Sequence, residues 1–167
     1  ATVSIKNTIS KLKEKDFDGV LITDHNSYKG YKSLDLDELQ EFKVLRGVEY
    51  NTKDAGHFII VLPTGMDYEI FTLKGIDYYK LGLCNNPNWL RKIDLIKQLD
   101  FIETFNACGR DYGNILSAQL AEFLDKPNFG GSDSHREESV GLGYTKFNEV
   151  INNENDLIRV VKNGNFL

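Results

Sequence analysis

The sequence predicts an α/β domain with a mainly parallel sheet. Apolar runs of strand length alternate along the chain with stretches whose apolar residues recur at helical spacing. Polar residues stand at or just after the ends of the apolar runs, which is where functional groups gather in such folds. The chain has 167 residues, of which 41% are hydrophobic. This length and composition suit one globular domain, and we expect residues 1–167 to form it.

The first half of the chain alternates between the two kinds of element. Val3, Ile5, Ile9 and Leu12 share one side of a predicted helix over 3–15. Three apolar runs predict strands, and a short helix is expected between the first two of them. The strands are 17–23, 44–50 and 57–62, the helix is 36–42, and residues 76–84 have a mixed pattern that is partly strand-like.

The second half repeats the alternation more regularly. Leu90, Ile93, Ile96 and Leu99 recur at helical spacing after Pro87. A second helix is predicted from Ile115, Leu116, Leu120, Phe123 and Leu124, which would form its apolar side. The remaining elements are strands at 100–106, 127–133 and 142–147 and a helix over 154–164 that ends at Gly164.

Composition excludes several classes of protein. The formal charge of −5 and the pI near 5.2 disfavour nucleic acid as a partner, because such binders present a basic face. No apolar run approaches the ~20 residues of a membrane span, and the start ATVSIKNTIS lacks the core of a signal peptide. Cys84 and Cys108 form no C-x-x-C motif. A reduced cytoplasmic protein is therefore preferred over one with a disulfide.

The three histidines of the chain occur in unusual contexts. His25 ends TDH, His57 follows a glycine, and His135 ends SDSH. Each could be structural by itself, and SDSH could simply cap a helix. Asp133 and His135 are two residues apart, so in an extended segment both would point to one face. Imidazole and carboxylate suit Mn²⁺, Fe²⁺ and Zn²⁺, and Asp24 could orient a neighbouring ligand. Together the contexts favour a metal site.

Four stretches resemble, in order, the motifs of the PHP (polymerase and histidinol phosphatase) family. They are VLITDHNS, VLRGVEYNTKDAGHFIIVL, DFIETFNACGR and FGGSDSHREESVGLGYTKF. The resemblance implies a distorted seven-stranded β/α barrel whose two or three divalent metal ions (Mn, Fe or Zn) serve phosphoester hydrolysis. Within the family, the sequence is most similar in form to the small stand-alone enzymes. The ligands it implies are His25, Glu49, His57, Asp133 and His135.

Two features depart from the family pattern. The family opens with a strand that ends in His-x-His, and this sequence starts where that strand would have ended. We therefore expect about 10–20 further residues upstream, one strand and its loop, in the parent protein. The family often has a histidine before the proline of the segment LGLCNNPNW, where this sequence has Asn86. A third metal is accordingly less expected than the first two.

The expected reaction is hydrolysis of a small phosphorylated substrate, a phosphomonoester or a nucleotide, by metal-activated water. Glu49 is the predicted bridging ligand, and with Asp133 and His135 it forms the predicted catalytic group. Arg110 and Arg136 follow the motifs directly and could bind phosphate bidentately, or could be ordinary surface residues. The predicted substrate-binding residues are Arg110, Arg136 and Asn106.

Two other functions are compatible with the sequence. One is a catalytically incomplete PHP-like domain that serves as a metal-stabilised binding or scaffold module. The other is hydrolysis of a C–N bond, which the GVE and TDHN contexts disfavour. Neither the substrate nor the oligomeric state follows from the sequence.

Overall fold

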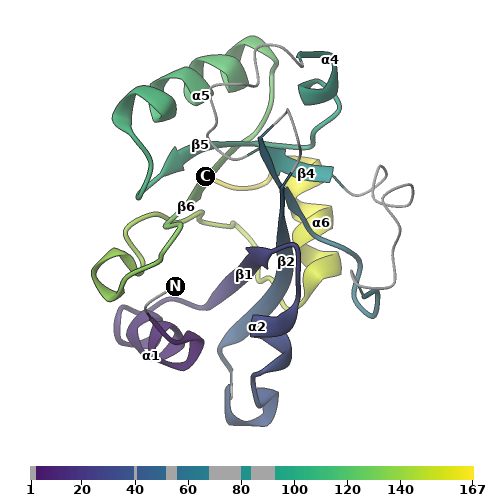
Figure 1. The fold of residues 1–167 in the computed structure, drawn as a ribbon. Coiled ribbons are helices and arrows are strands. Elements are labelled where there is room, and N and C mark those ends of the chain that lie inside the picture. The colour runs from purple at the N-terminus through teal and green to yellow at the C-terminus, as the bar shows by residue number, and fades with distance from the viewer. Residues whose placement is uncertain (1–2, 40, 52–55, 68–79, 84–92) are drawn as a thin grey trace.

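The computed structural model of the chain describes residues 3–39, 41–51, 56–67, 80–83 and 93–167. Helices and strands alternate along it, as Figure 1 shows. The strands are β1 (Gly19–His25), β2 (Lys43–Asn51), β3 (His57–Ile60), β4 (Lys80–Leu83), β5 (Ile102–Asn106) and β6 (Asn128–Gly131). The α-helices are α1 (Ile5–Glu14), α2 (Lys29–Lys32), α4 (Ile93–Ile96), α5 (Asp111–Phe123) and α6 (Glu154–Asn163), with 3-10 turns at Leu36–Leu39 and Glu137–Ser139.

The strands form two open sheets. The first has the order β1-β2-β3-β4, and the second pairs β5 with β6. The β1–β2 and β5–β6 pairs are parallel, whereas β2–β3 and β3–β4 are antiparallel. The α/β class is thus confirmed, but the mainly parallel sheet was wrong for the described strands. Only five residues separate Asn51 from His57, which is enough for a hairpin and too few for a parallel crossover.

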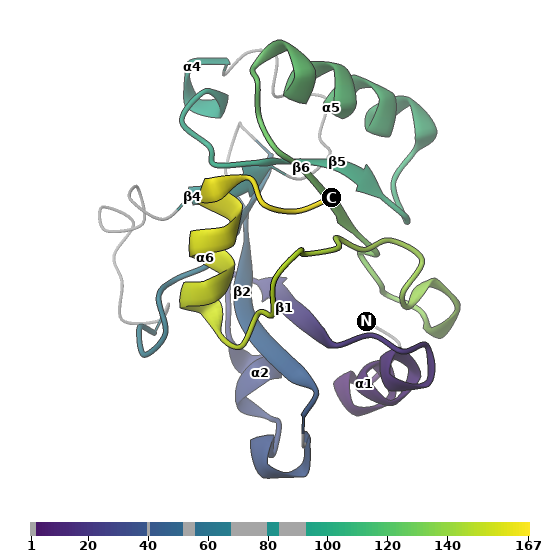
Figure 2. The same ribbon diagram turned by 180° about the vertical axis from the view of Figure 1, so that it is seen from behind.

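The helices cover opposite faces of β3, because successive residues of a strand point to opposite sides. Phe58 and Ile60 pack with Ile96, Leu120 and Ala121 under α4 and α5. Ile59, between them, packs instead with residues of α6 such as Leu157 and Val161. Figures 1 and 2 show α5 and α6 on different sides of the strands from both directions.

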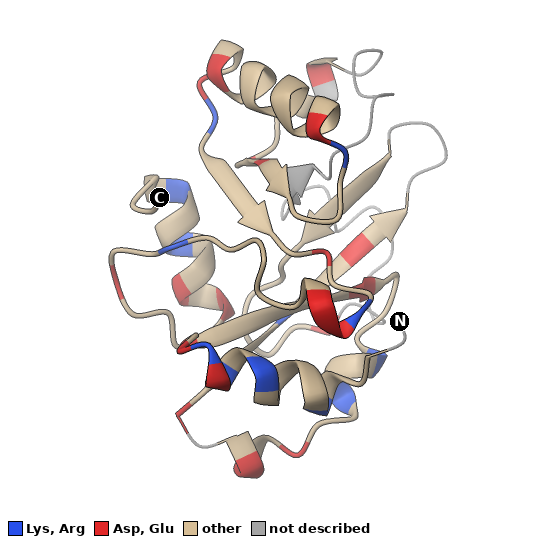
Figure 3. Ribbon diagram, turned by 90° about the vertical axis from the view of Figure 1, so that its left-hand side faces the viewer, with Lys and Arg blue, Asp and Glu red and all other residues tan. Residues whose placement is uncertain are grey.

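The first helix packs against the segment that follows β6. Ser4 caps α1 by accepting a hydrogen bond from the Asn7 N–H. Its buried residues Ile9 and Leu12 join a cluster with Phe42 and Val140. Lys11 lies 3.7 Å from Glu137, and Figure 3 shows the basic side of α1 beside the acidic turn at 137–138. This packing fixes the end of the GGSDSHR segment.

Most predicted elements are confirmed, including the helix over 154–164, whose cap Gly164 has φ of 66°. The strand predicted at 142–147 was wrong. Thr145 Oγ1 accepts from the backbone N–H of Gly130 and donates to its C=O. Hydrogen bonds of a side chain thus take the place of the backbone hydrogen bonds that would join two strands here. A Cβ on Gly143 would lie 2.1 Å from the Gly131 oxygen, which shows how closely the two backbones approach.

The apolar side predicted for α5 was partly wrong. Ile115 is 58% exposed and Phe123 is 79% exposed, whereas Ser117, Leu120 and Ala121 are buried. The helix predicted from Leu90 to Leu99 is described only from Ile93 onward, and Cys84, Asn86 and Pro87 lie outside the described residues. Within the described residues, no helix combines the length and apolar character needed to cross a bilayer.

Candidate metal centre

His25, Glu49 and His57 form a row across three adjacent strands. In the parallel ladder His25 is the register partner of Glu49. In the antiparallel ladder Glu49 pairs with Ile59, and His57 lies two residues before Ile59 on the same face. The row lies where β1 and β2 end and β3 begins. Strand register therefore brings together three side chains that are distant in sequence.

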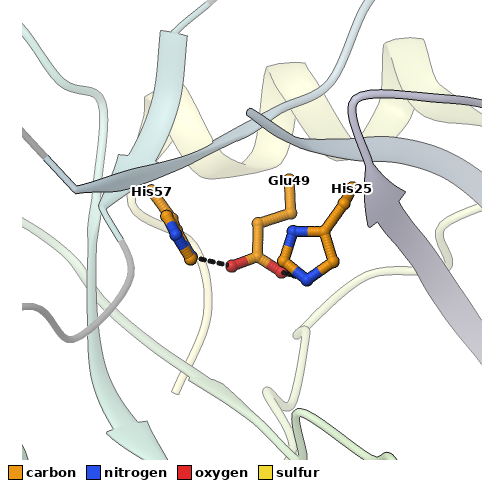
Figure 4. Close-up of side chains that lie close together, drawn as sticks. All are labelled: His25, Glu49 and His57. Atoms are coloured by element: carbon orange, nitrogen blue, oxygen red, sulfur yellow. Dashed lines mark hydrogen bonds and ion pairs between the residues drawn. The ribbon is translucent and has the colours of Figure 1, made fainter. Parts of the chain in front are cut away.

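The Glu49 carboxylate directs one oxygen toward each imidazole, as Figure 4 shows. Oε1 is 2.5 Å from Nδ1 of His57, and Oε2 is 3.7 Å from Nε2 of His25. The side chain of Glu49 is only 14% exposed, whereas those of His25 and His57 are 50% and 40% exposed. The three potential ligand atoms all lie within 4.8 Å of one another. The group is thus accessible and compact enough to hold a metal ion.

His25 contacts Asn51 with one ring nitrogen and faces Glu49 with the other. Nδ1 lies 3.1 Å from Oδ1 of Asn51, and this contact is a hydrogen bond when Nδ1 carries the proton. In that tautomer the neutral ring has its lone pair on Nε2, which faces Oε2 of Glu49. A metal ion between Nε2 and Oε2 would make their approach favourable. Metal–ligand bonds of about 2.0–2.2 Å place neighbouring ligand atoms about 3–4 Å apart, which fits this pair.

Asp133 and His135 form a second group after β6. Asp133 has φ of 46°, a left-handed conformation, so the chain is not extended at this residue, as the predicted common face of Asp133 and His135 would require. The chain turns back, and Nδ1 of His135 lies 2.9 Å from the Asp133 carbonyl oxygen. A carbonyl only accepts, so Nδ1 carries the proton and the neutral ring has its lone pair on Nε2. Asp133 and His135 are 41% and 58% exposed in their side chains.

The Asp133 carboxylate is connected to a buried pair on β5. Nδ2 of Asn106 lies 3.2 Å from Oδ2 of Asp133 and 3.4 Å from Oε2 of Glu103. Asn106 is 7% exposed and Glu103 is 4% exposed. Both amide hydrogens of Asn106 are directed at carboxylates here, and its predicted contact with substrate stays a prediction.

One open cavity of about 2040 Å³ is lined by members of both groups. Leu21 and Leu45 line it on the same strand faces as His25 and Glu49. Since β1 and β2 are parallel, the polar residues lie toward the C-terminal ends of the strands and the apolar residues toward their starts. The polar residues of the lining include His25, Glu49, Glu103, Asn106, Asp133 and His135. Convergence of all five predicted ligands on one metal centre stays a prediction.

The neighbouring polar residues have separate tasks. Asp24 accepts a hydrogen bond from the Gly30 N–H in α2, so this contact does not orient a ligand. Ser132 does not cap a helix as considered from sequence. Its Oγ donates to the Gly143 carbonyl and accepts from the Gly141 and Gly143 N–H groups. These contacts hold the loops on both sides of the candidate site.

The two predicted phosphate-binding arginines are exposed at the starts of helical turns. Arg110 is the N-cap residue of α5, and Arg136 is the N-cap residue of the 3-10 turn Glu137–Ser139. Neither cap makes a side-chain capping hydrogen bond. Their role in substrate binding stays a prediction.

Sequence reasoning missed Glu103, Asn51 and Asn114. Asn114 on α5 clamps the backbone of Asn106, because its Oδ1 accepts from the N–H and its Nδ2 donates to the C=O. A signal existed for Glu103, since a carboxylate within an apolar strand is unusual unless it has a partner. Asn51 and Asn114 gave no comparable signal, because asparagine at a strand end or in a first helical turn is common.

Comparisons with known proteins agree with this architecture. Residues 112–166 match the family model PHP_C, described as PHP-associated. The predicted relation to the PHP family is thereby confirmed, through the C-terminal region of the chain. The fold is similar to that of PsfC from Pseudomonas syringae PB-5123, with a TM-score of 0.69 and 18% identity over 95% of this chain and 80% of PsfC. At this identity the likeness concerns the fold alone. No curated protein sequence is significantly similar to this chain.

Proposed function

We propose that this protein is a metal-dependent phosphoesterase that hydrolyses a small phosphorylated substrate, a phosphomonoester or a nucleotide. The observation that carries the proposal is the position of Glu49, whose carboxylate directs one oxygen to His57 and the other to His25. A carboxylate with an imidazole at each oxygen is suited to bridge two metal ions. The match of residues 112–166 to a PHP-associated family supports this chemistry.

The residues that would hold two or three divalent ions are His25, Glu49, His57, Asp133 and His135. Bound Mn²⁺, Fe²⁺ or Zn²⁺ would supply a water of lowered pKa and neutralise phosphoryl oxygens. Glu49, Asp133 and His135 would form the catalytic group around the scissile bond. Arg110 and Arg136 would bind the phosphate through their planar guanidinium groups, and their exposure leaves them accessible to it.

The finer fold proposal is a distorted β/α barrel of the PHP type. Its support is the arrangement of the two sheet edges. β1 is an edge strand of the first sheet, β6 is a strand of the second, and residues of both line the same cavity. None of the seven residues of β1 is fully buried, as expected for a strand with one unpaired side.

A catalytically incomplete PHP-like module is the second candidate. It is favoured by the number of donors, since the described residues gather into one compact group of three, His25, Glu49 and His57. Three donors can hold a single ion without providing a second one for hydrolysis. Such a protein would bind metal and would not turn over phosphoesters.

Assays of the purified protein with Mn²⁺, Fe²⁺ or Zn²⁺ test the proposal. The substrates would be a panel of nucleotides, sugar phosphates and histidinol phosphate, with released phosphate as the readout. We expect turnover that a chelator abolishes and that Glu49→Gln removes. Metal binding without turnover of any compound would favour the second candidate.

A further inference from the structure

We infer that Asn106 and Glu103 form a positioning device for Asp133: the buried Glu103 orients the Asn106 amide, and this amide fixes Oδ2 of Asp133 so that the rest of the carboxylate faces the candidate metal site. The inference rests on the proposed metal-dependent function and assigns a role to two residues of the same site.

The amide of Asn106 has a single orientation in this network. Its Oδ1 accepts from the Cys108 N–H at 2.9 Å, and only an oxygen can do so. Nδ2 must therefore be the atom that faces Glu103 and Asp133. Its two hydrogens match the two carboxylate oxygens, and a neutral amide between two carboxylates separates their charges.

The backbone beneath Asn106 is held independently of its side chain. Asn114 contacts both the N–H and the C=O of Asn106, at 2.9 and 3.2 Å. The next residue, Ala107, donates its N–H to the Gly131 carbonyl on β6. The start of the amide side chain is thus fixed relative to the strand that leads to Asp133.

Glu103 occupies space that a glycine leaves open. A Cβ on Gly131 would lie 2.9 Å from Oε1 of Glu103, which is closer than ordinary packing allows. Its carboxylate is buried, and burying a charge without hydrogen bonds is costly. A carboxylate retained in such a place indicates specific contacts, and one of them is with Asn106.

Asp133 itself needs external support. Its side chain is 41% exposed, and its φ of 46° is a conformation that side-chain-bearing residues adopt at a cost. A half-exposed carboxylate on such a turn could occupy several rotamers. The Asn106 contact restricts Oδ2 to one place, and Oδ1 lies 3.5 Å from Nδ1 of His135 in the cavity that both residues line. Contacts of this kind that orient a metal ligand typically change metal affinity by about 10–100-fold when removed.

A double-mutant cycle on Mn²⁺ affinity, measured by titration calorimetry with Mn²⁺ alone, tests the inference. We expect Asn106→Ala to weaken Mn²⁺ binding about 10-fold or more, and to cause no further loss in an Asp133→Ala background. Glu103→Leu should weaken binding as Asn106→Ala does. Glu103→Gln should retain wild-type affinity, because its amide oxygen still accepts from Asn106.

Folding is controlled separately by thermal unfolding of each variant without metal. Two hydrogen bonds of the Asn114 side chain go to the backbone N–H and C=O of residue 106, so Asn106→Ala keeps them. Asn148→Ala is the matched control, since Asn148 bonds Asn165 at the exposed surface. If Asn106 had a purely structural role, Asn106→Ala would lower stability equally in the wild type and in Asp133→Ala. The coupling energy between the two residues in Mn²⁺ affinity would then be zero.

The outcomes separate this inference from the proposed function. If the wild type binds Mn²⁺ with the expected cycle and hydrolyses no phosphoester, the proposed function fails and the positioning role stands. If phosphoesters are hydrolysed and Asn106→Ala binds Mn²⁺ as the wild type does, the positioning role is overturned. Equal losses in the wild-type and Asp133→Ala backgrounds overturn it too, and a wild type that binds no Mn²⁺ contradicts both.

Discussion

His25 lies opposite Glu49 on adjacent parallel strands, and Nε2 of the histidine is 3.7 Å from Oε2 of the glutamate. The separation is too long for a hydrogen bond. It suits two ligands of one cation, and the contact of Nδ1 with Asn51 leaves Nε2 on the side of Glu49. This relation makes Glu49 the central residue of the candidate metal site.

Glu49→Gln is expected to weaken Mn²⁺ or Zn²⁺ binding by at least about 10-fold, because a neutral amide replaces a charged ligand that lies between two imidazoles. Titration calorimetry of the two proteins measures the difference. Glu38→Gln is the matched control, since Glu38 pairs only loosely with Lys6 at the surface, at 3.5 Å. Equal metal affinities in the wild type and Glu49→Gln would remove Glu49 from the site.

The row formed by His25, Glu49 and His57 could be predicted in part from the sequence. A strand that ends in His and a second that ends near Glu bring their side chains to one sheet edge when the strands are parallel. The antiparallel direction of β3, which begins at His57, was not expected. The short connection between Asn51 and His57 nevertheless already requires a hairpin. The relative direction of β2 and β3 could therefore have been derived from the length of the connection between them. The periodicity of apolar residues, by contrast, predicted which segments are strands and which are helices.

The second group was harder to predict because backbone conformation decides it. Spacing placed Asp133 and His135 on one face of an extended segment, yet the left-handed turn at Asp133 folds His135 back onto the Asp133 carbonyl. Asparagine and aspartate tolerate this conformation, so the sequence gives no clear signal for it. The burial of Glu103 likewise depends on the space beside Gly131, which no local pattern reports.

Asp133→Gly and Asp133→Ala are expected to separate stability from function. Both remove the carboxylate, so both should weaken metal binding and abolish any phosphoesterase activity. Glycine adopts φ near 46° without strain, whereas alanine does not, so Asp133→Gly should be more stable than Asp133→Ala by about 1 kcal/mol. Urea unfolding measures this difference. A glycine variant less stable than the alanine variant would contradict the left-handed turn.

Arg110→Ala is expected to raise KM about 10-fold or more with little change in kcat, because a charged hydrogen bond to phosphate contributes about 1.5–3 kcal/mol. The arginine is exposed at the start of α5, so unfolding should be unaffected. Steady-state kinetics with the best substrate of the panel make the measurement. Lys6→Ala, whose side chain on α1 is 69% exposed, serves as the control for loss of a positive charge. An unchanged KM would mean that Arg110 is an ordinary surface residue with no role in substrate binding.

A last prediction concerns the buried ion pair that joins α6 to β2. Glu154, the first residue of α6, accepts from Arg46 Nε at 3.0 Å, from the Arg46 N–H at 3.1 Å and from Thr64 Oγ1 at 2.9 Å. The side chains of Glu154 and Arg46 are 5% and 17% exposed. Burial by itself raises the pKa of Glu154, but hydrogen bonds from Arg46, Thr64 and the backbone outweigh it and hold this pKa below the ordinary 4.5.

The pair should therefore make stability depend on pH. Because the folded-state pKa of Glu154 lies below its unfolded value, the stabilisation is complete above about pH 5 and is lost as the pH falls through the folded-state pKa. Glu154→Gln should cost about 1–3 kcal/mol at pH 7, since it leaves the Arg46 charge without its anion. The two proteins should approach equal stability in acid. Urea unfolding of the wild type, Glu154→Gln and the surface control Glu38→Gln between pH 3 and 7, at about unit intervals, measures the convergence. Parallel curves for the wild type and Glu154→Gln would mean that Glu154 titrates alike in the folded and unfolded states, and the ion pair would then contribute nothing to acid sensitivity.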